Sequence, residues 1–184
     1  MLTSLREPNY YLLGFMGAGK STVGPLLAGR LDTQFYDLDQ LIEETEKSTI
    51  RQIFETRGEA FFRKKETELL LPLTRLRSAV IALGGGTFVQ EINRELIRST
   101  GISIWINVPL ERIQKRIQNP LSRPLFRTPQ EMEALFRQRE AFYAMADLEV
   151  RVGEEPVEDV ADKILSSITN FHELTQIPRS NEDS

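Results

Sequence analysis

The sequence predicts an α/β domain of three layers, in which helices cover both faces of a five-stranded, mainly parallel sheet. Two observations lead to this class. Apolar, β-prone runs alternate along the chain with stretches of helical periodicity, and such alternation builds parallel sheets through right-handed crossovers. The chain also has 184 residues, 40% of them hydrophobic, which is enough for one domain with a substantial core.

The predicted strands are the apolar runs at 10–13, 34–36, 79–83, 102–106 and 148–152. The stretches with helical spacing are 20–31, 38–46, 50–56, 60–76, 92–99, 110–118, 129–145 and 157–168. Three helical stretches in succession after the second strand predict a helical, acceptor-binding subdomain at about 38–77. The proline-rich segment at about 118–129 predicts a mobile lid. We expect a single domain over 1–172 and a disordered tail over 173–184.

Composition excludes several functional classes. The chain has no cysteine and one histidine, so it can form neither a disulfide framework nor a cluster of thiolate or histidine metal ligands. A net charge of −4 argues against a nucleic-acid-binding surface. No apolar run approaches the roughly 20 residues that a membrane span needs, and no signal peptide is recognisable. We expect a cytoplasmic monomer without nucleic-acid or membrane partners.

The segment GFMGAGKST, from Gly14 to Thr22, matches the pattern G-x-x-x-x-G-K-[ST] of a P-loop. It follows a predicted strand and opens a predicted helix, which is the context that this motif requires and which argues against a mere glycine-rich turn. In such a loop the backbone N–H groups surround a phosphate, Lys20 reaches the β- and γ-phosphates, and the Ser21 hydroxyl ligates Mg²⁺. The residues expected to hold the triphosphate are Gly17, Ala18, Gly19, Lys20, Ser21 and Thr22.

A triphosphate site leaves open a switch, a motor or a kinase. The late strands are not followed by an N-K-x-D loop, which a GTPase would use to read guanine. A motor ATPase would be larger and would carry an acidic residue after its third strand, where this chain has Gly84, Gly85 and Gly86. A kinase is therefore favoured.

Two carboxylates follow the second predicted strand, in FYDLDQLIE. Ligands of open α/β sheets bind at the carboxyl ends of the strands. There Asp37 would hold a water of the Mg²⁺ shell, and Asp39 would accept hydrogen bonds from an acceptor hydroxyl. The alternative is that Asp39 only caps the helix that starts at Gln40.

At this point a family resemblance becomes specific. The segments GFMGAGKSTVG, FYDLDQLIE, IFETRGEAFFRKKE, LGGGTF, SRPL and QREAFY occur in the order and approximate spacing of shikimate kinases. The chain resembles that family over about residues 9–170. The resemblance implies a P-loop NTPase fold like that of nucleoside-monophosphate kinases. It also implies transfer of the γ-phosphoryl group of ATP to the 3-hydroxyl of shikimate, with Mg²⁺, in the chorismate route to aromatic amino acids.

The resemblance also assigns roles by position. The catalytic residues would be Lys20, Asp39 and Arg123, the last of them on the lid. The metal would be held by Ser21 and Asp37. The adenine of ATP would pack against Arg116 and Pro156, and Arg123 would also contact the nucleotide. Shikimate would be bound by Asp39, Arg63, Gly84, Gly85, Gly86 and Arg139.

The two arginines suit a carboxylate on physical grounds as well. Guanidinium groups match a planar carboxylate in geometry and charge, and a pair of buried arginines is costly without an anion. The alternative for Arg63 is a surface position on a charged helix face, and for Arg139 an ion pair within its helix. The basic run from Arg112 to Arg127, which includes Arg123, is either a solvated face or a contact for a polyanion.

The glycines 84–86 predict a floor for the acceptor. A β-carbon there would stand between the backbone and a bound molecule, whereas glycine allows close approach and positive φ. We expect backbone N–H groups of Gly85 or Gly86 to face the acceptor; a tight turn is the alternative, but it needs only one glycine. Two other functions stay open, namely another small-molecule P-loop kinase (gluconate-kinase-like or a nucleoside-monophosphate kinase) and a catalytically silent, nucleotide-binding paralogue.

Overall fold

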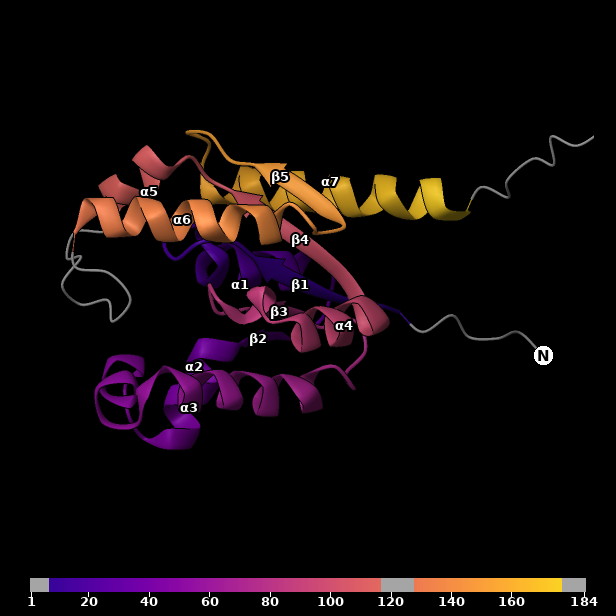
Figure 1. The fold of residues 1–184 in the computed structure, drawn as a ribbon. Helices are drawn as coiled ribbons and strands as arrows, with labels where there is room; N and C mark the ends of the chain where they lie inside the picture. The colour runs from indigo at the N-terminus through magenta and orange to yellow at the C-terminus, as the bar shows by residue number, and fades with distance from the viewer. Residues whose placement is uncertain (1–6, 117–127, 177–184) are drawn as a thin grey trace, which may run out of the picture.

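A computed structural model describes residues 7–116 and 128–176. Within them, five strands form one sheet in the order β2-β3-β1-β4-β5 (Figure 1). The strands are β1 (Asn9–Leu13), β2 (Phe35–Asp37), β3 (Val80–Ala82), β4 (Gly101–Asn107) and β5 (Leu148–Arg151). Every neighbouring pair is parallel, so the predicted sheet is confirmed.

Helices cover both faces of this sheet, as predicted. They are α1 (Lys20–Arg30), α2 (Leu38–Glu46), α3 (Ile50–Leu73), the short 3₁₀ helix η1 (Thr87–Val89), α4 (Glu91–Thr100), α5 (Leu110–Arg116), α6 (Pro129–Tyr143) and α7 (Val157–Gln176). Helix α1 packs on β1, β3 and α7, whereas α4 and α6 pack around η1 and α4 also packs on β4. All five residues of β1 are buried, which places the core along the centre of the sheet.

Helices α2 and α3 form a pair beside the edge strand β2 (Figure 1). The two predicted helices over 50–56 and 60–76 correspond to the two parts of α3, which Gly58 divides with a non-helical backbone (φ 81°, ψ 171°), and the second part ends at Leu73. A residue in that conformation interrupts the helical hydrogen bonds, which explains why the sequence periodicity breaks there. Thr49 and Gln52 begin α3 with a capping box.

The chain ends differ slightly from expectation. Helix α7 was predicted to end at residue 168 but runs to Gln176, so residues 173–176 of the predicted tail are helical. The sequence after Ile168 contains no glycine or proline before Pro178, and nothing in it stops the helix. Most of the predicted lid, including Arg123, lies in 117–127, outside the described residues. Among the described helices, none combines the length and apolar character that a membrane crossing requires.

The strand order decides what meets at the carboxyl edge of the sheet. The aspartates after β2 would have lain beside the P-loop directly if β1 and β2 were neighbours, but β3 separates these two strands. The glycines that follow β3 therefore reach the same edge as the aspartates and the P-loop, and Asp37 still contacts Ser21 of the P-loop directly. A short, side-chain-free turn in that place leaves room for side chains to converge from both directions.

Candidate functional site

The P-loop joins β1 to α1, and the side chain of Lys20 lies against the backbone of the loop. Gly19 caps α1 in the left-handed region at φ 100°, which residues with a β-carbon rarely adopt. The Nζ of Lys20 donates hydrogen bonds to the carbonyl oxygens of Gly14 (2.8 Å) and Phe15 (3.2 Å). The positive end of the α1 dipole thus faces the loop, as a phosphate site requires.

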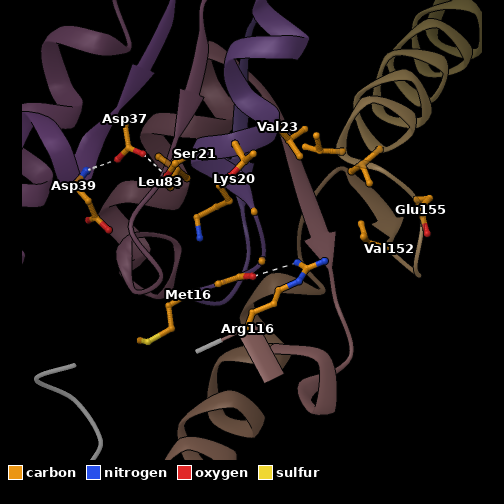
Figure 2. A pocket seen from close by; sticks show the side chains of 16 residues that line it. Met16, Lys20, Ser21, Val23, Asp37, Asp39, Leu83, Arg116, Val152 and Glu155 are labelled. Atoms are coloured by element: carbon orange, nitrogen blue, oxygen red, sulfur yellow. Dashed lines mark hydrogen bonds between the residues drawn. The ribbon is translucent and has the colours of Figure 1, made fainter. Parts of the chain in front are cut away.

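A cavity of about 410 Å³, which we call the P-loop cavity, opens above this loop. Its lining includes all the residues predicted to hold the triphosphate, Gly17, Ala18, Gly19, Lys20, Ser21 and Thr22. Figure 2 shows the Lys20 side chain extending into the space between Asp39 and Arg116, which both line the cavity. A polyphosphate bound along the loop would have the positively charged side chains of Lys20 and Arg116 beside it.

Ser21 and Asp37 lie together at one side of the P-loop cavity. The Ser21 hydroxyl donates to Oδ2 of Asp37 over 2.5 Å (Figure 2). Mg²⁺ prefers such hard oxygen ligands and needs only one or two from the protein when phosphates and water supply the rest. The two residues therefore fit the predicted metal role. In the described ranges, no group of three or more His, Cys, Asp or Glu side chains gathers as a metal cluster.

Asp37, and not Asp39, caps the helix that follows the second strand. Its Oδ1 accepts hydrogen bonds from the backbone N–H groups of Asp39 (3.0 Å) and Gln40 (3.3 Å). The alternative that Asp39 is merely a helix cap is wrong, because α2 begins at Leu38, as the predicted helix over 38–46 does, and not at Gln40. Asp39 is thereby left free of a capping role.

The carboxylate of Asp39 is half-buried and faces the cavity. Among the described residues its Oδ1 is fully buried and has no hydrogen-bond partner. Burial, followed by the negative charge of Glu66, raises the pKa of Asp39 to about 6, although Lys20 and Arg63 oppose this shift. A buried acceptor without a donor carries a desolvation penalty, which an incoming hydroxyl would relieve.

A second cavity of about 200 Å³, which we call the arginine cavity, adjoins the first. It brings together five of the six residues predicted to bind the acceptor, Asp39, Arg63, Gly85, Gly86 and Arg139. Met16 and Asp39 line both cavities. Asp39 therefore lies where a triphosphate in one cavity would meet an acceptor in the other.

Arg63 is held by two carboxylates of its own helix. Its guanidinium pairs with Glu66 at 2.6 Å and with Glu59 at 3.0 Å. Burial by itself would lower the pKa of Arg63, but these carboxylates raise it. The alternative of a solvated surface arginine is not what the structure shows, because only 18% of the side chain is exposed.

Arg139 is the more unusual of the two cations. It lies on α6, is only 5% exposed, and stands over the Phe15 ring at 5.8 Å. Within the described residues no carboxylate forms an ion pair with it, so the alternative of an intrahelical pair does not hold there. Burial lowers the pKa of Arg139, which its contact with Tyr143 partly offsets. A buried guanidinium without a paired carboxylate is a strong anion site.

The three glycines are required by the side chains around them. A β-carbon on Gly84 would lie 2.5 Å from Oδ1 of Asp39, and one on Gly86 would lie 2.4 Å from Nη1 of Arg63. None of the three has positive φ, so close approach rather than backbone conformation explains them. Gly84 does not line the arginine cavity but backs Asp39. Gly85 and Gly86 line the arginine cavity, as the predicted acceptor floor requires, and all three glycines also leave room for charged side chains of the protein itself.

The adenine end of the site is only partly described. Arg116 lines the P-loop cavity and donates to the carbonyl oxygen of Gly17 over 3.3 Å (Figure 2). Pro156 does not line the cavity, although its neighbours Glu155 and Val157 do. Arg123 lies outside the described residues. Its role and those of Arg116 and Pro156 stay predictions.

Sequence reasoning missed three residues of the site. Glu66 is fully buried, accepts from Thr87 Oγ1 over 2.5 Å, and pairs with Arg63. Tyr143 donates its hydroxyl hydrogen to the carbonyl oxygen of Gly85 over 2.5 Å. Met16 separates the two cavities. The helical spacings i,i+3 from Arg63 to Glu66 and i,i+4 from Arg139 to Tyr143 were the available signals for the first two.

Comparisons with known proteins point to one family. A family model described as shikimate kinase matches residues 16–169. A shikimate kinase of Microcystis aeruginosa is 43% identical over 169 residues, which cover 90% of this chain and 88% of that protein. A shikimate kinase of Aquifex aeolicus is 42% identical over 159 residues, which cover 86% of this chain and 94% of that protein.

The same family is found among solved structures. A shikimate kinase from Acinetobacter baumannii, solved in complex with shikimate, has a TM-score of 0.86 and 36% sequence identity. The match covers 94% of this chain and 96% of that one.

Proposed function

The chain belongs to the shikimate kinase family, and we propose that it transfers the γ-phosphoryl group of ATP to the 3-hydroxyl of shikimate. The products are ADP and shikimate 3-phosphate, an intermediate of the chorismate route to aromatic amino acids. In this reaction the triphosphate occupies the P-loop cavity and shikimate occupies the arginine cavity.

One observation carries the acceptor assignment. The buried guanidinium of Arg139, which no carboxylate of the described residues pairs with, faces the same small cavity as Arg63 and Asp39. A planar carboxylate satisfies two guanidinium groups, whereas a neutral polyol would leave their charge uncompensated. Shikimate carries one carboxylate and three hydroxyls on a ring. Its carboxylate suits the two arginines at one end of the cavity, and its hydroxyls can donate hydrogen bonds to the Asp39 carboxylate at the other.

Asp39 orients the attacking oxygen. With the shikimate carboxylate on Arg63 and Arg139, a ring hydroxyl reaches the Asp39 carboxylate at the junction of the cavities. The raised pKa of Asp39 brings this carboxyl closer to the pH at which a general base works well. Asp39 thus binds the hydroxyl in line with the γ-phosphoryl group and can take its proton as the new bond forms.

The P-loop stabilises the charge of the transferring group. Phosphoryl transfer proceeds through a loose transition state whose charge lies on the equatorial oxygens, so positioning and electrostatics provide most of the catalysis. Lys20 and the backbone N–H groups at the start of α1 bind these oxygens. Ser21 and Asp37 would hold Mg²⁺, directly or through water, and the ion would neutralise charge on the β- and γ-phosphates.

Arg123 is proposed to close onto the transferring phosphate from the lid at about 118–129, and Arg116 and Pro156 to pack the adenine. The pair α2 and α3 is proposed to act as the acceptor-binding subdomain. A monomeric state and a cytoplasmic location also stay predictions.

A substrate panel tests the proposed function. ADP release is measured by a coupled assay with ATP, Mg²⁺ and one acceptor at a time, namely shikimate, gluconate or AMP. We expect saturable release with shikimate and only the ATPase background with the others. The Lys20→Ala variant controls for contaminating kinases. Release with gluconate or AMP and none with shikimate would contradict the proposal and favour one of the rival kinases, and no release with any acceptor would favour a silent paralogue.

A further inference from the structure

Tyr143 is a buried residue of the site for which the reaction described so far has no use. It ends α6, is only 1% exposed, and packs its ring against that of Trp105 on β4, with 6.1 Å between the ring centroids. Its hydroxyl donates to the carbonyl oxygen of Gly85 over 2.5 Å. A phenol enclosed in this way keeps one orientation, because rotating it would leave a buried polar group unpaired.

The same hydroxyl lies near the guanidinium of Arg139, since both groups face Gly85 and each affects the pKa of the other. The two residues are four apart on α6 and so lie on one face of that helix. A β-carbon on Gly85 would lie 3.0 Å from Nη1 of Arg139 and 3.8 Å from the Tyr143 hydroxyl oxygen. Helix α6 and the glycine turn after β3 are thus joined at one point, by one side-chain oxygen.

The direction of these contacts follows from the donors available. A guanidinium can only donate, and a carbonyl can only accept. Burial raises the pKa of Tyr143 to about 12, so its phenol keeps its proton and remains the donor to Gly85 at any working pH. The phenol oxygen can therefore only accept from the nearby guanidinium, which restricts how Arg139 can turn in the arginine cavity.

We infer that Tyr143 is a positioning residue for the acceptor carboxylate: its hydroxyl fixes the Arg139 guanidinium against the turn at Gly85. This inference rests on the proposed function. Without the hydroxyl, Arg139 would still be buried and charged but would rotate within its pocket. The acceptor would then bind more weakly, whereas the nucleotide, which contacts the P-loop cavity, would not be affected.

The test compares two conservative variants, Tyr143→Phe and Tyr11→Phe. Tyr11 is also fully buried, and its hydroxyl bonds to Oγ1 of Thr100 at 2.7 Å, next to the amino end of β4 and away from both cavities. We expect Tyr143→Phe to raise the KM for shikimate roughly tenfold, the size expected for one hydrogen bond to a charged group, with the KM for ATP within twofold. Tyr11→Phe should leave both KM values within twofold.

A second measurement separates positioning from general loosening of the fold. Dissociation constants of shikimate and of its uncharged methyl ester are measured by titration calorimetry. Tyr143→Phe should weaken shikimate about tenfold and the ester less than twofold, because only the carboxylate uses Arg139. Neither KM nor the dissociation constant depends on how much of a preparation is folded, so partial loss of folded protein leaves the test valid.

The outcomes are distinct. A shikimate KM within twofold of the parent, an equal rise in both KM values, or equal weakening of acid and ester would overturn the inference while shikimate kinase activity stands. Absence of shikimate-dependent ADP release in the parent protein would instead contradict the proposed function, and the inference with it.

Discussion

Asp37 and Asp39 are two residues apart at the end of one strand, yet both carboxylate oxygens accept hydrogen bonds only in Asp37. Asp37 accepts from Ser21 and from two backbone N–H groups, whereas Oδ1 of Asp39 has no partner among the described residues. The difference arises because α2 begins at Leu38, which makes Asp37 the capping residue and turns Asp39 toward the cavities. One carboxylate is structural and metal-directed, and the other is available to the acceptor.

Replacing Asp39 should slow the chemical step more than it weakens nucleotide binding. We expect Asp39→Asn to lower kcat by about 10²-fold or more, the usual range for losing a general base, while the KM for ATP changes less than threefold. Steady-state kinetics with both substrates check this. Asp162→Asn, an exposed aspartate that pairs with Arg30 on the surface, is the matched control. An unchanged kcat in Asp39→Asn would remove this residue from the mechanism.

The same substitution should stabilise the ligand-free protein in a pH-dependent way. The pKa of Asp39 is raised from 3.8 to about 6 on folding, so the unfolded chain loses this proton first, and stability falls as pH rises from about 4 to about 6. At pH 7.5 the ionised carboxylate then costs up to about 3 kcal/mol, which Asp39→Asn removes. Urea unfolding should show a stabilised variant at pH 7.5 and a much smaller difference at pH 4. Equal differences at both values would contradict the shift.

Arg139 offers a comparison within one helix. Arg137 lies two residues away on α6 but is exposed and pairs with Glu133 and Glu140. We expect Arg139→Ala to raise the KM for shikimate on the order of 10²-fold with little change for ATP, since a charge-assisted contact to the carboxylate is lost. Arg137→Ala should leave both KM values near those of the parent, and Arg63→Ala should resemble Arg139→Ala. Equal effects on shikimate and ATP would argue against a carboxylate site at these arginines.

Alanine substitutions in the glycine turn should weaken shikimate binding more where the added β-carbon lies closer to a neighbouring side chain. A β-carbon on Gly86 would lie 2.4 Å from the Arg63 guanidinium, and one on Gly85 would lie 3.0 Å from that of Arg139. Gly85→Ala should therefore weaken shikimate before ATP, and Gly86→Ala should do so more strongly. Gly29→Ala is the control, because a β-carbon there meets nothing within 4 Å, and it should stabilise α1 by about 0.5–1 kcal/mol. Kinetics indistinguishable from the parent in Gly86→Ala would show that Arg63 yields without loss.

The sequence predicted the fold because its signals are local. The P-loop pattern, the alternation of strands and helices, and the aspartates after the second strand each depend on a few neighbouring residues. The strand order is not local: placing β3 between β1 and β2 depends on packing of the whole sheet. The alternative of Asp39 as helix cap did not agree with the predicted helix over 38–46, whose start at Leu38 makes Asp37 the capping residue.

The residues that hold the substrate-binding side chains in place were harder to predict from the sequence than those side chains themselves. The positions of Arg63 and Arg139 follow from the family resemblance, but their partners Glu66 and Tyr143 are buried by contacts across the fold. Nor does the sequence reveal why the turn carries three glycines. Each glycine lies against a different side chain from another element: Gly84 against Asp39, Gly85 against Arg139 and Gly86 against Arg63.

A crystal structure of the protein with ADP, Mg²⁺ and shikimate shows directly whether the two cavities bind the two substrates as proposed. We expect the shikimate carboxylate within hydrogen-bond distance of both Arg63 and Arg139, and a ring hydroxyl on the Asp39 carboxylate, facing the ADP phosphates in the P-loop cavity. Shikimate bound with its carboxylate away from the two arginines, or with no hydroxyl at Asp39, would contradict this expectation.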